Sequence, residues 1–415
     1  MSETVLIIGT LDTKTKELNY LRKRIEAEGV QSLLMDVSCK AVPSGAISDI
    51  SCSEVAKESG KDFDEIIRLD KVSAVNLMTE GAIKIGNRLF DEERIQAVIG
   101  LGGANGTELT CRVMRTLPIG FPKLMVTCVA SGNVRPYVGT KDIMMANSIG
   151  DISLNRITKR VINNAARAIA HMAHEEGVEE EETKPQICMS TFGTTFPCVE
   201  RAKGLLEEMG FEVIELHASG AGGMALEELV KSGEVSGVLD ITTSELVDDL
   251  VDGTYSAGPH RLEAAGAMGV PQVVSLGALD FGNFGPKESV PQRYRDRHFF
   301  FYTPSVTLMR TNVEENQILG KRIAEKLNVS RGPAAVIIPT KGFSVLDRAG
   351  GKKMTTIDGT VSGEWHDEAA NSALIESIKH HLDASKVRCV EVDAHLSDPA
   401  FAEAAVQLLA ELMKK

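Results

Sequence analysis

Residues 96–110 read QAVIGLGGANGTELT, and this stretch decides the kind of fold that the chain adopts. Ala97–Leu101 is a short apolar run typical of a buried strand, and a helical pattern is evident from Glu108. Between them lies a loop of small residues, Gly102–Thr107. A strand, a small-residue loop and a helix in this order point free backbone N–H groups at an anion. The stretch therefore predicts either a phosphate site or only a tight turn between strand and helix.

The alternation of short apolar runs with helical periods continues along the chain. Further strands are predicted at Gly237–Ile241, Ala334–Ile338 and Val387–Val392. The stretches VLIIGTLDTKTKEL and ICMSTFGTTFPCVERA both give a strand, a Gly-Thr turn and an amphipathic helix, as duplicated halves would. These patterns predict an α/β fold of two Rossmann-like, doubly wound parallel-sheet subdomains. Ligands of such sheets bind at the carboxyl ends of the strands, so we expect a cleft between the subdomains.

An acidic run, EEGVEEEETK at residues 175–184, lies between the two halves. Blocks of like charge repel one another and stay solvated, so the run predicts a linker. We therefore expect an N-terminal Rossmann-like subdomain over residues 1–180 and a C-terminal Rossmann-like subdomain over residues 185–415.

Composition narrows the functional classes. The chain has 415 residues, 43% of them hydrophobic, and a net charge of -13. An acidic chain is a poor match for sequence-independent nucleic-acid binding, so no nucleic-acid partner is expected. No apolar run reaches the roughly 18 residues of a membrane span, and the N-terminus lacks the basic region of a signal peptide. The seven cysteines form no C-x-x-C pair. We expect a cytoplasmic homo-oligomer with no membrane partner.

The glycine-rich loop carries the first candidate chemistry. Glycine lacks Cβ, so the backbone at Gly102, Gly103 and Gly106 can approach a phosphate closely. Thr107 is expected in the first helical turn, where its hydroxyl can bind phosphate or help hold Mg²⁺. No lysine occupies the loop, so it is not a P-loop.

The turn after the first strand is the second candidate. Gly9 and Thr10 end the strand, and Asp12, Thr13 and Lys14 begin a helix. The hydroxyls and the Lys14 ammonium can bind a phosphate, and Asp12 can support a metal. The alternative is that Asp12 or Thr13 only caps the helix.

A third loop follows the strand that ends near Thr127. The candidate binding residues are Thr127 itself and Ser131 and Asn133, which come directly after it. Hydroxyl and amide groups at this place suit the recognition of a ribose, a base edge or a phosphate. The alternative is a loop that only faces solvent.

The second half offers different side chains. Residues 242–245, Thr-Thr-Ser-Glu, resemble a capping box. His260 and Arg261 are expected to be exposed at a helix start, where they either bind an anionic substrate or only face solvent. Asp280 follows another predicted strand and is a candidate base. The nine histidines are scattered and define no ligand set, so the metal-binding residues stay unknown.

Seven stretches together resemble the Tm-1-like ATP-binding domain family. They run in order along almost the whole chain: IGTLDTK, GLGGANGTEL, TSELVDDL, SAGPHRLEAA, GALDFGNFG, TLMRTN and DAHLSDPAFA. The family's glycine loop is richer in glycine than the one here, in which Ala104 and Asn105 take two of the small-residue places. Asn tolerates the left-handed region better than most residues, so the loop shape is expected to persist.

The resemblance implies two Rossmann-like subdomains, with ATP held mainly by the first. Carried onto this sequence, it assigns phosphate contacts to the glycine loop and places the first and third loops beside it. The residues concerned are Gly102, Gly103, Gly106 and Thr107, with Gly9, Thr10 and Asp12 as neighbours and Ser131 and Asn133 nearby.

Three functions are compatible with these observations. The first is an ATP- and Mg²⁺-dependent enzyme of phosphoryl or nucleotidyl transfer, acting on a small anionic metabolite in the cleft. Asp12 or Asp280 is then the candidate base, with His260 and Arg261 beside the substrate. The second is a nucleotide-gated binding module without turnover that recognises a protein partner. The third places NAD where ATP would lie, with Asp36 after the second strand as the only feature suited to its ribose.

Overall fold

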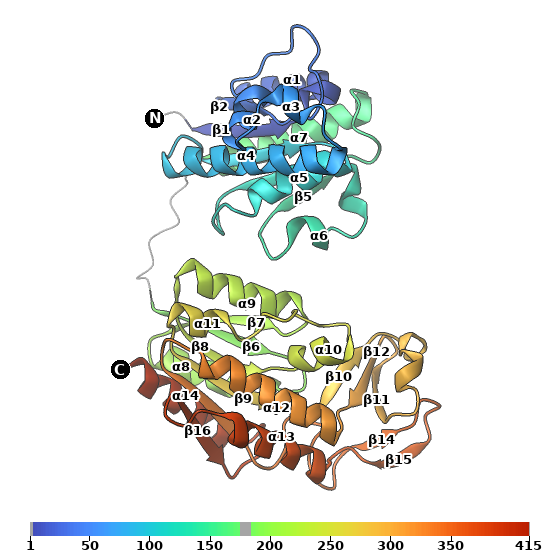
Figure 1. The fold of residues 1–415 in the computed structure, drawn as a ribbon, viewed down its shortest axis with the longest axis vertical. Coiled ribbons are helices and arrows are strands. Elements are labelled where there is room, and N and C mark those ends of the chain that lie inside the picture. The colour runs from blue at the N-terminus through green and yellow to red at the C-terminus, as the bar shows by residue number, and fades with distance from the viewer. Residues whose placement is uncertain (1–2, 175–183, 415) are drawn as a thin grey trace. The chain divides into compact units, whose positions relative to one another are not determined.

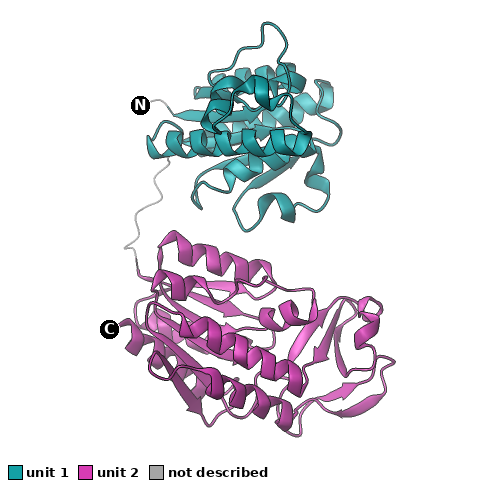
Figure 2. Ribbon diagram, viewed as in Figure 1, with its two compact units in different colours: residues 1–181 teal, residues 182–415 magenta. Residues whose placement is uncertain are grey.

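The computed structural model describes residues 3–174 and 184–414. The chain divides into two compact units, unit 1 over Met1–Glu181 and unit 2 over Glu182–Lys415 (Figures 1 and 2). All but the last residue of the acidic run at 175–184 lies outside the described residues. Each unit has hydrophobic clusters of its own.

Unit 1 is built on a five-stranded parallel sheet of order β2-β1-β3-β4-β5. The strands are β1 (Thr4–Gly9), β2 (Gln31–Asp36), β3 (Ala97–Leu101), β4 (Lys123–Thr127) and β5 (Met144–Asn147). The strand predicted at residues 97–101 is thus confirmed. The chain moves outward in one direction from β1 to β2 and in the other from β3 to β5. This reversal between β1 and β3 makes the sheet doubly wound.

Helices cover both faces of this sheet (Figure 1). α1 (Leu11–Glu26) and α7 (Arg156–Ala173) pack on the face that carries Val5 and Ile7. The opposite face, which carries Leu6 and Ile8, packs against a second group of helices. That group is α2 (Cys52–Glu58), α4 (Lys71–Asp91) and α5 (Ala104–Met114), with the short α3 (Phe63–Ile66) beside them. Because both faces are buried, β1 reads as a continuous apolar run rather than an alternating one.

Unit 2 repeats the scheme with one strand more. Its six-stranded parallel sheet has the order β7-β6-β8-β9-β13-β16, so the reversal lies between β6 and β8. The strands are β6 (Gln186–Thr191), β7 (Glu212–His217), β8 (Val235–Thr242), β9 (Gln272–Gly277), β13 (Ala334–Pro339) and β16 (Val387–Val392). The three strands predicted in this half are confirmed.

The helices of unit 2 also divide between the two faces (Figure 1). α8 (Phe196–Glu208) and α14 (Pro399–Met413) pack together on one face. The other face carries α12 (Val313–Asn328) and α13 (Glu368–His381), and next to them α9 (Ala221–Ser232), α10 (Glu245–Val251) and α11 (Ala264–Met268). The parallel α/β architecture predicted for both halves is therefore confirmed.

A second sheet in unit 2 was not predicted. It is antiparallel, of order β10-β12-β11-β14-β15, and most of it is inserted between β9 and β13. Its strands are β10 (Phe281–Phe284), β11 (Phe299–Thr303), β12 (Val306–Arg310), β14 (Lys353–Thr355) and β15 (Val361–Glu364). Strands of three to five residues are too short to show an alternating pattern, which explains the omission.

A glycine in α4 makes the packing of unit 1 testable. A Cβ at Gly81 would lie 1.9 Å from the backbone oxygen of Val55 in α2, so the two helices would have to separate. We expect Gly81→Ala to lower the free energy of unfolding by about 1–3 kcal/mol, measured by urea denaturation. Gly204→Ala in α8 is the control, because a Cβ there meets nothing within 4 Å. The helix propensity of alanine should then stabilise that variant by up to about 1 kcal/mol. Equal losses in both variants would contradict this packing.

Candidate functional site

The reversal of strand order in unit 1 marks the place where a ligand is expected. In doubly wound sheets, the crevice outside the carboxyl ends of the strands opens at this point. Here it lies between β1 and β3, whose ends lead into α1 and α5. The backbone N–H groups in the first turns of α1 and α5 are therefore the donors that a ligand at this point could meet.

The first turn of α5 has four unpaired N–H groups. The helix begins at Ala104, four residues earlier than the pattern from Glu108 indicated, and its N-cap, Gly103, makes no side-chain cap. The first helical bond runs from the Thr107 N–H to the Gly103 carbonyl at 2.8 Å. Within residues 3–174 and 184–414, the N–H groups of residues 103–106 donate no hydrogen bond. These four donors point out of the helix start, where its dipole is positive.

Two glycines leave space beside these donors. A Cβ built at Gly103 or at Gly106 would meet no atom within 4 Å. The φ of Gly103 is -74°, a value that any residue adopts, so the backbone does not require glycine there. Gly102 differs, because its Cβ would lie 3.0 Å from the Gly106 Cα. Glycine at 102 thus lets the first helical turn lie close against the strand end.

The first turn of α1 has its N–H groups occupied. The Leu11 N–H donates to Asp36 Oδ1 at 3.1 Å, and the Asp12 N–H donates to Ser38 Oγ at 3.0 Å. The Lys14 N–H donates to the Thr10 carbonyl at 2.9 Å. The N-cap is Thr10, so the prediction that Asp12 or Thr13 caps this helix is wrong. The N–H groups of Leu11, Asp12 and Lys14 are therefore not available to an anion.

The other predicted residues of the first loop serve the fold in part. A Cβ at Gly9 would lie 2.5 Å from a methyl group of Leu18, so glycine here permits helix packing. The Lys14 ammonium donates to the Ile152 carbonyl and is therefore turned toward the loop after β5. Asp12 is half-buried, and burial is the main cause that raises the pKa of its carboxyl group.

Thr107 and Thr127 hold the end of β4 against α5. Their hydroxyl oxygens lie 2.7 Å apart, and both side chains are fully buried. Thr107 Oγ1 also donates to the Gly103 carbonyl at 2.9 Å, and Thr127 Oγ1 accepts from the Val129 N–H at 3.2 Å. These contacts use the two hydroxyls inside the protein, so their role in this geometry is to position the turn.

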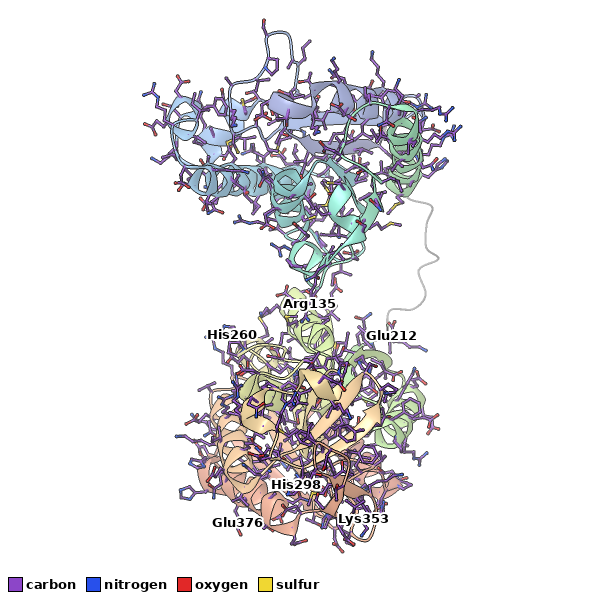
Figure 3. The ribbon with its side chains drawn as sticks, turned by 90° about the vertical axis from the view of Figure 1, so that its right-hand side faces the viewer. Arg135, Glu212, His260, His298, Lys353 and Glu376 are labelled. Atoms are coloured by element: carbon purple, nitrogen blue, oxygen red, sulfur yellow. The ribbon has the colours of Figure 1, made fainter. Side chains whose placement is uncertain are left out.

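Ser131 and Asn133 lie on the exposed loop that follows β4. Ser131 ends a short 3-10 turn that begins at Cys128, and its hydroxyl is accessible. Asn133 is exposed, and its Oδ1 accepts from the Arg135 N–H at 3.2 Å. Arg135 itself lies at the surface of unit 1, at the start of α6 (Arg135–Val138) (Figure 3).

Arg261 is buried, and the prediction that it is exposed at a helix start is wrong. Its side chain has no exposed surface. The guanidinium donates from Nη2 to Asp240 Oδ1 at 2.7 Å and from Nε to Glu245 Oε2 at 2.7 Å. Glu227 Oε1 lies 3.5 Å from Nη1. Arg261 thus neutralises carboxylates inside unit 2 and is not available to a substrate.

The same carboxylates close two helix starts in unit 2. Glu245 Oε1 accepts from the Gly220 and Gly223 N–H groups at the start of α9, at 2.7 and 3.0 Å. Glu227 accepts from the N–H groups of residues 262–264, next to the start of α11. Burial raises the pKa of Glu245, although the Arg261 charge lowers it. The stretch 242–245 is not a capping box, because the N-cap Ser244 makes no side-chain cap.

His260 is separate from this network. Its side chain is 81% exposed, and Nδ1 lies 2.9 Å from Glu263 Oε2 (Figure 3). His260 and Arg261 are adjacent in the sequence, but in this turn one side chain is exposed and the other is buried.

Asp280 is fully buried in unit 2. Its Oδ2 accepts from Trp365 Nε1 at 2.7 Å and from Ser344 Oγ at 2.8 Å. Burial, and next the charge of Asp347, raise the pKa of Asp280 to about 6. In unit 2, His260, Arg261 and Asp280 therefore occupy three different surroundings, and Asp12 belongs to unit 1.

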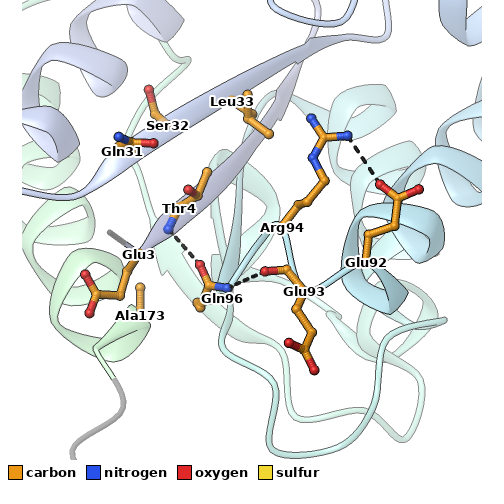
Figure 4. A pocket seen from close by; sticks show the side chains of 10 residues that line it. All are labelled: Glu3, Thr4, Gln31, Ser32, Leu33, Glu92, Glu93, Arg94, Gln96 and Ala173. Carbon is orange, nitrogen blue, oxygen red and sulfur yellow. Dashed lines mark hydrogen bonds and ion pairs between the residues drawn. The ribbon is translucent and has the colours of Figure 1, made fainter. Parts of the chain in front are cut away.

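The described residues include no group of three or more His, Cys, Asp or Glu side chains that could hold a metal ion. A pocket of about 790 Å³ does exist in unit 1 (Figure 4). It lies at the amino ends of β1 and β2, on the opposite edge of the sheet from α5's first turn. Glu3, Glu92 and Glu93 line it, and Arg94 is paired with Glu92 at 3.3 Å. Its charge does not suit a phosphate. Over residues 3–174 and 184–414, no helix combines the length and apolar character that crossing a bilayer requires.

Comparison with known proteins gives matches to both units. Residues 3–177 match the "Uncharacterised protein family (UPF0261) N-terminal domain", and residues 184–413 match the corresponding C-terminal domain. A UPF0261 protein of Clostridium tetani is 40% identical over the whole of both chains. One from Rhizobium meliloti is 39% identical over 97% of each.

The ToMV resistance protein Tm-1 of Solanum lycopersicum is 35% identical to this chain over 100% of its length, which corresponds to 56% of the tomato protein. Among solved structures, the UDP-GlcNAc 2-epimerase of Methanocaldococcus jannaschii is 12% identical and covers 66% of this chain and 83% of its own. With a TM-score of 0.23, that likeness carries no argument about the site.

Arg261→Met tests the buried ion network of unit 2. The change leaves buried carboxylates without their cation, so we expect a loss of about 3–5 kcal/mol in the free energy of unfolding. Arg293→Met is the control, because the Arg293–Asp252 pair is exposed and should contribute less than about 1 kcal/mol. Urea denaturation followed by circular dichroism measures both. Similar small losses would show that Arg261 does not hold the network.

Asp280→Asn tests the buried acid. Its pKa is raised from 3.8 to about 6, so the stability that this group contributes is full below pH 4 and is lost as pH rises through 6. Asparagine can still accept from Trp365 and Ser344 but carries no charge. We expect the variant to be more stable at pH 8 by about 2–3 kcal/mol and less dependent on pH between 4 and 7. Denaturation curves at pH 4–8 for both proteins give the comparison, and parallel pH dependences would refute the assignment.

Proposed function

The chain belongs to the UPF0261 family, and from that premise we propose that its N-terminal unit binds ATP, with the phosphates at the first turn of α5. The observation that carries this proposal is the set of four N–H groups at residues 103–106 without acceptors among the described residues. Unpaired donors at a helix start, aided by the helix dipole, are the standard partners of phosphate oxygens. The open space beside Gly103 and Gly106 gives those oxygens room to approach.

The contrast between the two helix starts favours a mononucleotide over NAD. A dinucleotide of the Rossmann type places its pyrophosphate at the helix after the first strand and its ribose against the acid after the second. In this chain, Asp36 is 2% exposed and accepts from the N–H groups of Leu11 and Ser38. The Leu11 N–H is therefore not available to a pyrophosphate, and the Asp36 carboxylate is not available to a ribose. The free donors lie instead after β3. A triphosphate bound after β3 would need neither the start of α1 nor the Asp36 carboxylate.

Neighbouring loops supply the rest of the proposed site. Ser131 and Asn133 are exposed on the loop after β4, and their hydroxyl and amide groups suit a ribose or a base edge. Thr10 and Asp12, at the end of β1, adjoin the same point of strand reversal. A Mg²⁺ ion that accompanies ATP would be held by phosphate oxygens, water and one or two protein oxygens. The carboxylate of Asp12, in the turn after β1, is the candidate protein ligand. When bound, the ion would neutralise phosphate charge.

The reaction is the less constrained part of the proposal. We propose phosphoryl or nucleotidyl transfer from ATP to a small metabolite, but Arg261 cannot bind an anionic substrate because it is buried among carboxylates. A nucleotide-gated binding module without turnover is the second candidate. The observation that favours it is that His260, Arg261 and Asp280 do not come together within unit 2. Incubation with Mg-ATP and a metabolite panel separates the two: product formation supports the enzyme, and capture of a protein partner without product supports the module.

Gly103→Val tests the proposed ATP site. The φ of Gly103 is one that valine adopts, and the Cβ of valine would meet no described atom within 4 Å, so we expect the fold to be unchanged. Its side chain would occupy the space proposed for phosphate. We expect the affinity for Mg-ATP, measured by isothermal titration, to fall at least about 100-fold, which corresponds to about 2.7 kcal/mol.

Gly204→Val in α8 is the matched control, since its side chain also enters free space but lies in unit 2. This variant should bind Mg-ATP like the unaltered protein. Wild-type affinity in Gly103→Val, with an unaltered circular dichroism spectrum, would exclude the start of α5 as the ATP site.

A further inference from the structure

We propose that unit 2 carries a ligand site of its own, for an uncharged polyhydroxyl compound, at the carboxyl ends of β6, β8 and β9. The proposal does not depend on ATP binding by unit 1. It rests on three buried side-chain oxygens without hydrogen-bond partners among the described residues, and on the engagement of Arg261 and Arg310 by other groups of unit 2.

The three oxygens are Thr194 Oγ1, Ser244 Oγ and Asp280 Oδ1. Each belongs to a side chain with 0% exposure, and none has a hydrogen-bond partner among the described residues. More than nine-tenths of buried polar groups in proteins are paired, because an unpaired one costs the free energy of its lost hydration. Three unpaired oxygens on neighbouring loops therefore indicate that a partner from outside the chain completes them.

Backbone and side-chain hydrogen bonds hold the loops that carry these oxygens together. The Val345 N–H donates to the Thr194 carbonyl at 2.9 Å, and Ser344 Oγ donates to Asp280 Oδ2 at 2.8 Å, so residues 344–345 link the loops after β6 and β9. The Thr243 N–H, next to Ser244, donates to the Gly277 carbonyl at 3.0 Å. The ends of β6, β8 and β9 are thus fixed side by side.

The position is the one where a doubly wound sheet takes its ligand. The strand order of unit 2 reverses between β6 and β8, and Thr194 and Ser244 follow these two strands directly. By the same rule that points to α5 in unit 1, the crevice of this sheet lies between their carboxyl ends. Gly193 is exposed next to the buried Thr194, so the loop after β6 reaches from solvent to the unpaired hydroxyl.

The chemistry of the surroundings favours hydroxyl groups over an anion. Two hydroxyls donate and accept, and Asp280 Oδ1 accepts when the carboxyl group is ionised. The buried cations of unit 2 are already engaged, Arg261 by carboxylates and Arg310 by the Trp365 carbonyl and Asn371 Oδ1. A polyol can both donate to the carboxylate and exchange hydrogen bonds with the hydroxyls, without bringing charge into a buried place.

Aromatic rings border these loops. The Phe192 and Phe281 ring centroids lie 6.2 Å apart, and those of Phe281 and Trp365 lie 6.5 Å apart. Phe192 precedes Thr194 by two residues, and Trp365 donates to Asp280. Small-molecule sites combine such apolar walls with a few polar groups that fix orientation, and the C–H faces of a polyol suit the walls.

Thr194→Val tests whether the hydroxyl is kept for a ligand. Valine has the same shape but no hydroxyl, so the ligand-free variant should lose an unpaired buried group and melt about 2–4 °C higher. Thr195→Val is the matched control one residue along, since Thr195 Oγ1 lies 2.7 Å from Thr242 Oγ1 and 3.2 Å from the Phe192 nitrogen. That variant should melt lower than the unaltered protein. If both variants melt lower by similar amounts, the Thr194 hydroxyl is paired by ordered water only, and the proposal fails.

Saturation-transfer NMR of the full chain tests binding directly, with myo-inositol as the uncharged probe and acetate as the anionic one. We expect transfer to myo-inositol, its loss in Thr194→Val and Ser244→Ala, and its retention in Gly103→Val. Transfer that is retained in Gly103→Val shows that myo-inositol binds separately from the proposed ATP site. If unit 1 did not bind ATP, the expected transfer to myo-inositol would be the same. Transfer to acetate in place of myo-inositol, or transfer to neither probe, overturns the proposal.

Discussion

A helix leaves the N–H groups of its first turn without partners inside the helix, and this requirement shapes both units. α1 meets it with Asp36 and Ser38, and α9 meets it with Glu245. At α5 no side chain or carbonyl of the described residues does so. The difference is what distinguishes a closed helix start from one able to hold an anion. Glycine at 102 and 103 is the local cause, because neither residue offers a side-chain acceptor.

The closed starts in unit 2 have a second consequence for its interior. Capping with Glu245 and Glu227 brings carboxylates into a buried region that already contains Asp240. Such charges are stable there only beside a cation, and Arg261 is the side chain that reaches all of them. One guanidinium faces three carboxyl groups. Burial raises the pKa of Glu245, and the charge of Arg261 acts in the opposite direction and lowers it. Arg261 therefore supports these helix caps, because its positive charge stabilises the buried carboxylates of Glu227 and Glu245.

The sequence predicted what depends on local pattern and missed what depends on distant partners. The strand at 97–101 and the helix after it follow from apolar periodicity, and with them the α/β architecture. The burial of Arg261 could not be read in the same way, because its partners lie 16 and 21 residues away and on different elements. Asp36 was noticed as a ribose-binding acid, yet its bond to the Leu11 N–H spans 25 residues. For α5, the glycine cluster predicted a loop that leaves N–H groups unpaired at a helix start, and phosphate binding by these groups stays a prediction.

The free volume around Gly103 has an evolutionary consequence. At Gly81, the fold itself selects against any side chain, because the Val55 oxygen occupies the space. At Gly103, the backbone conformation is ordinary and a Cβ would meet no described atom within 4 Å. Drift among natural variants would therefore erase glycine from position 103 over time unless the occupant of that space imposed a selection of its own. Gly81 is thus required by the packing of the protein, whereas only the proposed phosphate would select for glycine at position 103.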